Sequence, residues 1–249
     1  MRKNGESICM KILFGVINAV QIILIIVWTA FCGLSGILMM LIMWNGPLVH
    51  LIQGKYLWSP FVCLISGVNI KVSGLQHVQP ENPAIYVANH ASHYDIVAIS
   101  RVMPLGLFFV AKKELSRIPL MGQYMHLIGH IFVDRKNKEN ALKSMALAAE
   151  KIRKGKSVIS FPEGTRSKSD QMNLFKRGSF IIAKEGKIDV VPIAIKGSRK
   201  ILPSGSFSIR PGTIEVMIGE RIPASSFSHL SVEEIASLAQ ERVRNLLHQ

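Results

Sequence analysis

The stretch AIYVANHASHYD, residues 84–95, carries the local signals from which the fold can be worked out. Its first part, Ala84–Ala88, is a short apolar run, which is typical of a buried strand. From Ile96 to Val102 apolar residues recur every three or four positions, which is the spacing of an amphipathic helix. Ser92 stands three residues before Asp95, as in a capping box at a helix start. The stretch therefore predicts a strand, a tight loop and a helix in direct succession.

The same alternation of strand and helix signals continues along the chain. We expect strands at Val68–Val72, Ala84–Ala88, Leu107–Ala111, His130–Val133, Ser157–Phe161, Val190–Ile195 and Thr213–Ile218. We expect helices at Asp95–Met103, Leu120–Leu127, Lys138–Arg153, Gly178–Lys184 and Val232–Leu247. Gly155 follows three basic residues and predicts a helix end, and Ser231 with Glu234 predicts a capping box. The pattern predicts an α/β domain with a mixed sheet flanked by helices, because Ile209–Thr213 resembles a turn into a late, non-parallel strand.

His90 lies in the predicted loop, and the turn can bring it next to Asp95. On a continuous helix the two would not be neighbours, because positions five apart do not share a face. A histidine beside an aspartate is a base whose tautomer and orientation are fixed. The chain has no cysteine nearby and no Gly-x-Ser-x-Gly elbow. We therefore expect the nucleophile to be a substrate hydroxyl or water activated by His90.

Two other interpretations of this loop remain open at this point. His90, His93 and Asp95 could bind a metal ion, although the downstream segments that would close such a site offer mostly Arg and Lys, which repel a cation. Alternatively, Asp95 merely caps the helix and His90 has no special role.

Two arginines follow other predicted strands. Arg135 stands just past His130–Val133, and Arg166 belongs to the turn FPEGTRS, residues 161–167. Loops at one end of the strands of an α/β domain converge on one crevice, so both arginines are expected near His90. Guanidinium groups match phosphate oxygens bidentately, which predicts a phosphate clamp. Lys112 and Lys176-Arg177 either add to the clamp or face lipid headgroups.

The composition is both apolar and basic. Hydrophobic residues make up 49% of the 249, and the formal net charge is +14. From Phe61 onward the chain holds 26 Lys and Arg against 15 Asp and Glu, so the charge lies mainly in the part expected to be globular. A basic and strongly apolar chain indicates contact with an anionic membrane surface.

The front end has no Asp, Glu, Lys or Arg between Lys11 and Lys55. As one helix, Ile12–Trp44 would be about 50 Å long, against a hydrocarbon core of about 30 Å. We therefore expect a two-helix membrane anchor with a break near Gly33–Gly36 or near Asn45–Pro47. A cleaved signal peptide is the less favoured alternative, because the apolar run is too long. Residues 1–60 are assigned to the anchor and residues 61–249 to the catalytic domain.

Basic residues flank the apolar run on both sides, so both flanks prefer the cytoplasm. A returning hairpin or a shallow insertion in one leaflet satisfies this rule, whereas a single crossing does not.

Four short sequence blocks follow one another along the chain. They are Asn89-His90-x-x-x-x-Asp95, Gly129-x-x-Phe132-Val133-Asp134-Arg135, Phe161-Pro162-Glu163-Gly164-Thr165-Arg166-Ser167 and Val191-Pro192-Ile193. Together they resemble the four motifs of the glycerolipid acyltransferases, and most of all those of the bacterial 1-acyl-sn-glycerol-3-phosphate acyltransferases. The resemblance covers roughly residues 60–220 and the general character of the anchor.

The resemblance implies a reaction and a role for each block. His90, oriented by Asp95, would take the proton of the sn-2 hydroxyl of 1-acyl-sn-glycerol-3-phosphate, and the oxygen would attack an acyl thioester directly to give phosphatidic acid. Glu163, Gly164, Thr165 and Arg166, with Arg135, would bind the glycerol phosphate, and the block around Pro192 is associated with the acyl donor. The co-substrate would be acyl-CoA or acyl-acyl carrier protein, with no metal and no other cofactor. The expected place is the cytoplasmic face of a bacterial inner membrane.

Several alternatives to this reaction stay open. The acceptor could be a lyso-ornithine lipid, another lysophospholipid or, less favoured, glycerol-3-phosphate. A non-catalytic module that binds nucleic acid or anionic lipid is disfavoured, because aromatic residues make up only 7% of the chain and the arginines follow strand ends. We therefore expect no nucleic-acid partner. Acyl donor, acyl-chain preference and oligomeric state are left open by the sequence.

Overall fold

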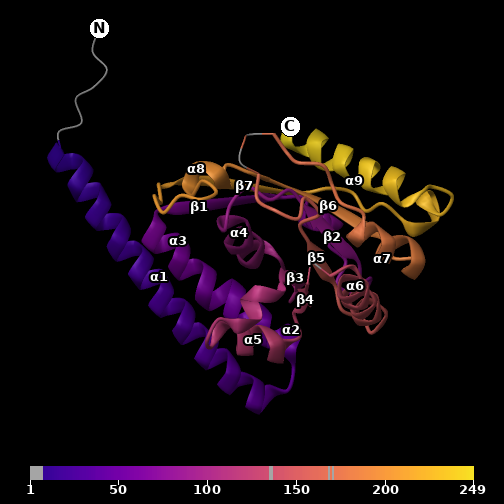
Figure 1. Cartoon of the computed structure of the whole chain (residues 1–249), viewed down its shortest axis with the longest axis horizontal. Helices are drawn as coiled ribbons and strands as arrows, with labels where there is room; N and C mark the ends of the chain where they lie inside the picture. Colours follow the sequence, from indigo (N-terminus) through magenta and orange to yellow (C-terminus); the bar gives the residue numbers. More distant parts are fainter. Residues whose placement is uncertain (1–7, 135–136, 168, 170) are drawn as a thin grey trace, which may run out of the picture.

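The computed structural model describes residues 8–134, 137–167, 169 and 171–249 of the chain. Its centre is a seven-stranded sheet in the order β1-β7-β6-β2-β5-β3-β4 (Figure 1). The strands are β1 (Val68–Ser73), β2 (Ile85–Ala88), β3 (Phe108–Lys112), β4 (Ile131–Val133), β5 (Val158–Ser160), β6 (Val190–Lys196) and β7 (Gly212–Ile218). Neighbouring strands are parallel except for β6 and β7, which are antiparallel. The expected mixed sheet and its seven strands are confirmed, with ends shifted by at most one residue.

Helices cover both faces of the sheet. They are α4 (Tyr94–Val102), α5 (Met121–Ile128), α6 (Lys138–Arg153), α7 (Gly178–Gly186), α8 (Ser198–Ile201) and α9 (Val232–Leu247), with short turns η2 (Leu75–His77), η3 (Lys113–Arg117) and η4 (Ala224–Phe227). Side chains of β2 alternate between the faces: Tyr86 and Ala88 join the core under α4 and α8, whereas Ile85 and Val87 join the core under α6, α7 and α9. Both cores are therefore continuous layers built from the period-two pattern of the strands.

The apolar front end forms two helical segments that meet at a sharp turn. The first is one helix, α1 (Ile8–Met43), and the second runs through α2 (Gly46–Leu51), the π-helical η1 (Ile52–Trp58) and α3 (Ser59–Ser66). The Oδ1 atom of Asn45 accepts a hydrogen bond from the amide of Leu48 at 3.1 Å, which caps the start of α2. The break thus lies at the second of the two expected places, and α1 continues through Gly33–Gly36. By length and composition alone, Met10–Met43 and Gly46–Ser66 could each cross a membrane.

Glycines in α1 serve close helix contact. A Cβ atom at Gly36 would lie 2.4 Å from the Cε2 atom of Tyr124 in α5, and one at Gly33 would lie 3.4 Å from the backbone of Leu120. These two glycines therefore permit a close approach, and they do not end the helix.

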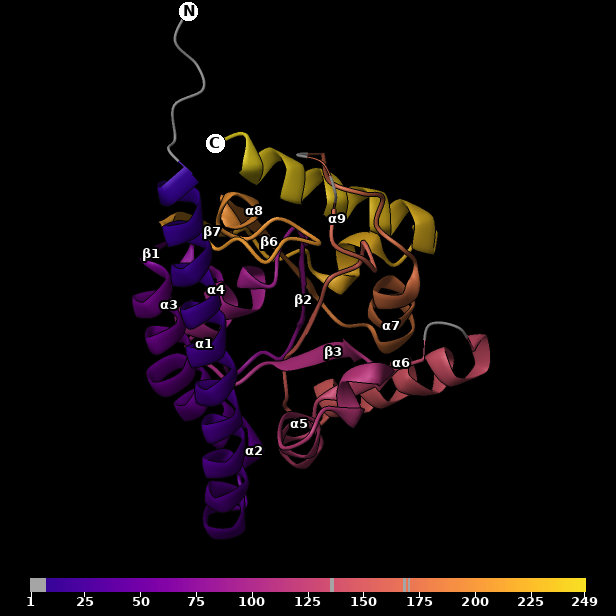
Figure 2. The same cartoon turned by 60° about the vertical axis from the view of Figure 1, so that its left-hand side comes forward.

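The anchor lies along the α/β domain, as Figure 2 shows. Near the start of α1 the Oδ1 atom of Asn18 accepts a hydrogen bond from the amide of Ile209, just before β7. The side-chain amide of Gln21 donates to the carbonyl of Ile65 in α3 at 2.8 Å. The expected boundary after residue 60 falls inside α3, whose Val62 is buried in the core that also holds α4. Large apolar side chains on the other face of α1 stay exposed, among them Ile12, Val16, Ile23, Val27, Leu38 and Ile42.

Candidate active site

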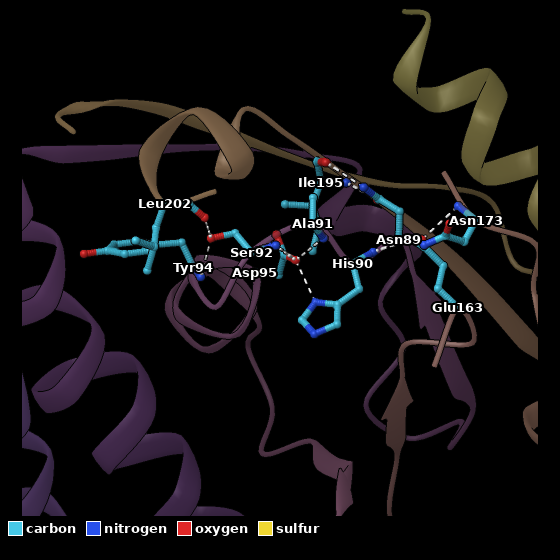
Figure 3. A network of polar contacts seen from close by, with 10 residues as sticks. All are labelled: Asn89, His90, Ala91, Ser92, Tyr94, Asp95, Glu163, Asn173, Ile195 and Leu202. Atoms are coloured by element: carbon cyan, nitrogen blue, oxygen red, sulfur yellow. Dashed lines mark hydrogen bonds and ion pairs between the residues drawn. The ribbon is translucent and has the colours of Figure 1, made fainter. Parts of the chain in front are cut away.

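The loop between β2 and α4 brings His90 and Asp95 together. The Nδ1 atom of His90 lies 2.8 Å from the Oδ2 atom of Asp95 (Figure 3). The same oxygen accepts hydrogen bonds from the amides of Ala91 at 2.8 Å and Ser92 at 2.9 Å. Asp95 is fully buried, so these donors compensate its Oδ2 atom for lost water, whereas Oδ1 has no hydrogen-bond partner among the described residues. An ionised Asp95 places the imidazole proton on Nδ1 and leaves Nε2 as the acceptor, pointing away from the carboxylate.

Two further contacts hold this loop in place. The side chain of Asn89 bridges to Ile195 of β6, accepting from its amide at 2.7 Å and donating to its carbonyl at 2.9 Å. The hydroxyl of Ser92 donates to the carbonyl of Leu202 at 2.7 Å and accepts from the amide of Tyr94 at 3.2 Å. The expected capping box is thus half formed: Asp95 binds the Ser92 amide, but the Ser92 hydroxyl binds the Tyr94 amide in place of that of Asp95.

The ring of His90 also packs against a neighbouring strand end. It stacks on Phe161, with ring centroids 4.2 Å apart and planes 21° apart. Phe161 directly follows β5, so the stacking places the imidazole over the junction of β2 and β5. The ring is therefore held by a hydrogen bond at its edge and by an aromatic ring at its face.

The turn after β5 crosses next to His90. The amide of Ser167 donates to the carbonyl of His90 at 2.8 Å, which holds Arg166 beside the loop between β2 and α4. Gly164 has a φ of +76°, and a Cβ atom there would lie 2.9 Å from the Nζ atom of Lys176. A residue other than glycine would be strained here by its backbone and crowded by that lysine.

A cavity of about 1270 Å³ opens in front of the imidazole. Of the residues predicted for the site, His90, Lys112, Gly164, Thr165 and Arg166 line it. Asp95 lies behind His90. Arg135 is outside the described residues, so its predicted role stays a prediction. Two cationic side chains, Lys112 and Arg166, therefore line the same cavity as His90.

Glu163 occupies a different place from the one that the sequence suggested. Its side chain is 2% exposed and is not among the cavity-lining residues. One carboxylate oxygen accepts from the amide of His90 at 2.6 Å, and the other accepts from the amide of Asn173 at 2.9 Å (Figure 3). Burial raises the pKa of Glu163, and the two amide hydrogen bonds oppose that shift. The carboxylate thus braces the loop behind His90, whereas a substrate ligand would face the cavity.

His93, which stands at an unspecified position of the first sequence block, also lines the cavity. Burial, followed by the positive charge of Arg166 and the neighbouring His90, lowers its pKa below 6.5. At neutral pH it therefore offers an uncharged imidazole near Arg166. Its place at the start of α4 was available from the sequence, but its orientation was not.

The apolar wall of the cavity was also missed. Residues of the anchor line it directly, among them Ile22, Ile25, Thr29 and Cys32 of α1 and Trp58 of η1. Hydrophobic segments look alike in sequence whether they face lipid or a substrate, so no sequence signal separates the two uses. The lining of the cavity therefore combines cationic side chains with an apolar wall.

Among the described residues, no group of three His, Cys, Asp or Glu side chains is arranged to hold a metal ion.

Comparisons with known proteins agree on one family. A family model described as "Acyltransferase" matches residues 69–196. The chain is 34% identical over 199 residues to a 1-acyl-sn-glycerol-3-phosphate acyltransferase of Limnanthes douglasii, covering 79% of this chain and 68% of the relative. It is 28% identical over 234 residues to the enzyme of that name from Saccharomyces cerevisiae, covering 90% and 76%.

A solved structure resembles the whole chain. The crystal structure of the 1-acyl-sn-glycerophosphate (LPA) acyltransferase PlsC from Thermotoga maritima superposes with a TM-score of 0.82 and 26% identity, covering 96% of both chains. The likeness therefore includes the helical front end as well as the sheet.

Proposed function

This chain belongs to the family of 1-acyl-sn-glycerol-3-phosphate acyltransferases, and from that premise we propose how its site performs the reaction. The acceptor is 1-acyl-sn-glycerol-3-phosphate, the donor is an acyl thioester, and the products are phosphatidic acid and a free thiol. The observation that carries the proposal is the place of His90. Its Nδ1 atom is bound to buried Asp95, and its ring lines a cavity that also contains Lys112 and Arg166.

The base and the nucleophile follow from this arrangement. The sn-2 hydroxyl of the acceptor gives its proton to Nε2 of His90 while its oxygen bonds to the thioester carbonyl carbon. Asp95 stabilises the imidazolium that results. The tetrahedral intermediate then collapses, the carbon–sulfur bond breaks, and the leaving sulfur takes the proton back from the imidazolium. No protein nucleophile and no acyl-enzyme are needed.

The phosphate of the acceptor is assigned to the part of the cavity wall that Arg166, Lys112 and Thr165 form. Arg166 offers bidentate hydrogen bonds, Lys112 offers a point charge, and Thr165 offers a hydroxyl. Binding the phosphate there anchors the acceptor, so that its hydroxyl reaches His90. The apolar wall, to which α1 contributes, suits fatty acyl chains.

The membrane arrangement is part of the proposal. Helix α1 contacts the α/β domain near both Asn18 and Gly36, positions 18 residues or about 27 Å apart along a helix. A helix held against the domain over that length cannot also cross a bilayer as a free rod. We therefore place the exposed apolar face of α1 in one leaflet, with the domain on the cytoplasmic face of a bacterial inner membrane, as the basic flanks favour.

The test is acyl transfer to lysophosphatidate, with labelled acyl-CoA and labelled acyl-acyl carrier protein as alternative donors. We expect His90→Ala to lower kcat by about 10²–10⁴-fold, which is the usual contribution of a general base. Asp95→Asn should give a similar loss, because it favours the wrong tautomer. Unchanged circular dichroism and membrane association would serve as the folding control. Normal turnover by His90→Ala would exclude the proposed dyad.

A further inference from the structure

We propose that Gln240, in the C-terminal helix α9, is a positioning residue for His90 and acts on it through Glu163. The inference rests on the proposed function, because it assumes that His90 is the base. Gln240 lies outside the segment matched by the family model, residues 69–196. The link runs through hydrogen bonds from α9 to the segment 173–175, then to Glu163, and from there to the backbone of His90.

The first link joins α9 to the segment after the β5 turn. The Oε1 atom of Gln240 accepts a hydrogen bond from the amide of Phe175 at 3.0 Å. Its Nε2 atom donates to the carbonyl of Asn173 at 3.5 Å, so one side chain holds both ends of the segment. Gln240 is 6% exposed and shares its helix face with apolar Ala236 and Val243. A buried amide on such a face is costly unless it is hydrogen-bonded, which favours a fixed geometry.

The second link joins that segment to the catalytic loop. Glu163 accepts from the Asn173 amide with Oε2 and from the His90 amide with Oε1. Because one buried carboxylate serves both amides, a shift of Asn173 must either move the carboxylate or break one of the bonds. A broken bond would leave a buried anion poorly compensated. The position of Asn173 is therefore transmitted to the backbone of His90.

The two braces of His90 control different degrees of freedom. Asp95 and Phe161 fix the orientation of the ring, whereas Glu163 and Ser167 hold the main chain from which the ring extends. A main-chain displacement carries Nε2 away from the acceptor hydroxyl without altering the pairing with Asp95. Displacements of about 1 Å at a reacting atom can lower a rate by about 100-fold. Loss of Gln240 should therefore appear in the chemical step.

The same segment also reaches the cavity. Asn173 lines it, and the amide of Lys176 donates to the carbonyl of Pro162 at 2.9 Å. The segment is thus tied to the β5 turn on one side and to α9 on the other. Gln240 is the buried polar side chain that secures the α9 side.

The experiment compares Gln240→Leu with Val243→Ala. Val243 is fully buried on the same helix and belongs to the same apolar core, and its apolar side chain makes no hydrogen bond to the segment 173–175. Its truncation should therefore destabilise α9 packing while the two hydrogen bonds of Gln240 stay available. With lysophosphatidate and donor both saturating, we expect Gln240→Leu to lower kcat at least tenfold while changing KM for lysophosphatidate by less than threefold. Val243→Ala should keep kcat within twofold despite a comparable loss of Tm. Should Gln240→Leu not fold, Gln240→Met replaces it, because its side chain is unbranched and similar in length.

A double-mutant cycle with Glu163→Gln tests the route. If Gln240 acts through Glu163, the loss of kcat in the double variant will be close to that of the worse single variant. Multiplied losses, or equal kcat in Gln240→Leu and Val243→Ala, would overturn the inference and reduce Gln240 to a packing role. The activity of the wild type separates a failure of this inference from a failure of the proposed function. An inactive wild type would refute the reaction itself. An active wild type, combined with multiplied losses or with equal kcat in the two single variants, would refute only the role of Gln240.

Discussion

At the scale of residues, two buried carboxylates of the site accept hydrogen bonds from donors within the protein. Asp95 receives three donors on one oxygen, and Glu163 receives a backbone amide on each of its two oxygens. Both carboxylates therefore bind donors of the protein itself. Lys112 and Arg166 line the cavity, so they are the described cations placed to meet a substrate anion there.

Arg166→Ala should mainly weaken acceptor binding. A hydrogen bond to a charged group contributes about 1.5–3 kcal/mol, so KM for lysophosphatidate should rise about 10- to 100-fold with a smaller change in kcat. Steady-state kinetics with varied acceptor measure the effect. Arg210→Ala is the matched control, because Arg210 is exposed and does not line the cavity. An unchanged KM in Arg166→Ala would contradict the clamp.

His130 predicts an acid sensitivity of the fold. Its Nδ1 atom accepts from the amide of Phe109 at 3.2 Å, and burial, with help from His50 and Lys151, lowers its pKa well below 6.5. In the unfolded chain the pKa is about 6.5, so below that pH the unfolded state binds the proton first. The contribution of neutral His130 to the free energy of unfolding is therefore fully present above about pH 6.5. It is lost as the pH falls from there through the pKa of His130 in the folded protein.

His130→Asn removes the titration and keeps an acceptor for Phe109. Between pH 7 and pH 5 the free energy of unfolding should then fall less steeply than in the wild type, by up to about 1.4 kcal/mol per pH unit. The Tm of the variant should accordingly fall less over the same range. Thermal unfolding across this range measures it. Parallel curves for the two proteins would show that His130 does not set the acid limit.

At the scale of elements, α1 depends on small residues where it meets α5. Gly36→Ala would place a methyl group against the ring of Tyr124, and such overpacking costs about 1–3 kcal/mol. Because Tyr124 lines the cavity, acyl transfer should fall together with Tm. Gly15→Ala is the control, since nothing lies within 4 Å of a Cβ there, and it should be neutral or stabilise α1 by up to about 1 kcal/mol. Equal Tm values for the two variants would contradict the packing argument.

The helices show which structural features sequence patterns can predict and which they cannot. Helices α6 and α9 have the expected bounds, and the Ser231–Glu234 capping box is present, because caps and periodicity are local properties. The uninterrupted helix at Gly33–Gly36 was less accessible, since whether a glycine ends a helix or permits contact depends on the element packed against it.

At the scale of the whole molecule, one-leaflet insertion predicts that the turn between α1 and α2 stays on the same side of the bilayer as the α/β domain. Trp44 is 82% exposed at the tip between α1 and α2. The test uses Trp44→Cys in a chain whose three native cysteines are replaced by alanine. This variant is inserted into sealed vesicles with its catalytic domain on the inside. An impermeant maleimide added outside should leave Cys at this position unlabelled until detergent is added. Labelling without detergent would mean that the anchor crosses the bilayer.

The sequence by itself determined the α/β class, the seven strands, the two apolar helical segments of the front end, and the neighbourhood of His90, Asp95 and Arg166. It could do so because strand periodicity, strand-end loops and the length of an apolar run are set by residues close together in the chain. Tertiary structure alone decided that α1 forms a wall of the cavity and that Glu163 faces the backbone of His90. Those outcomes depend on which distant segments meet, as α9 meets the segment 173–175 through Gln240, and a buried carboxylate takes its role from the donors that surround it.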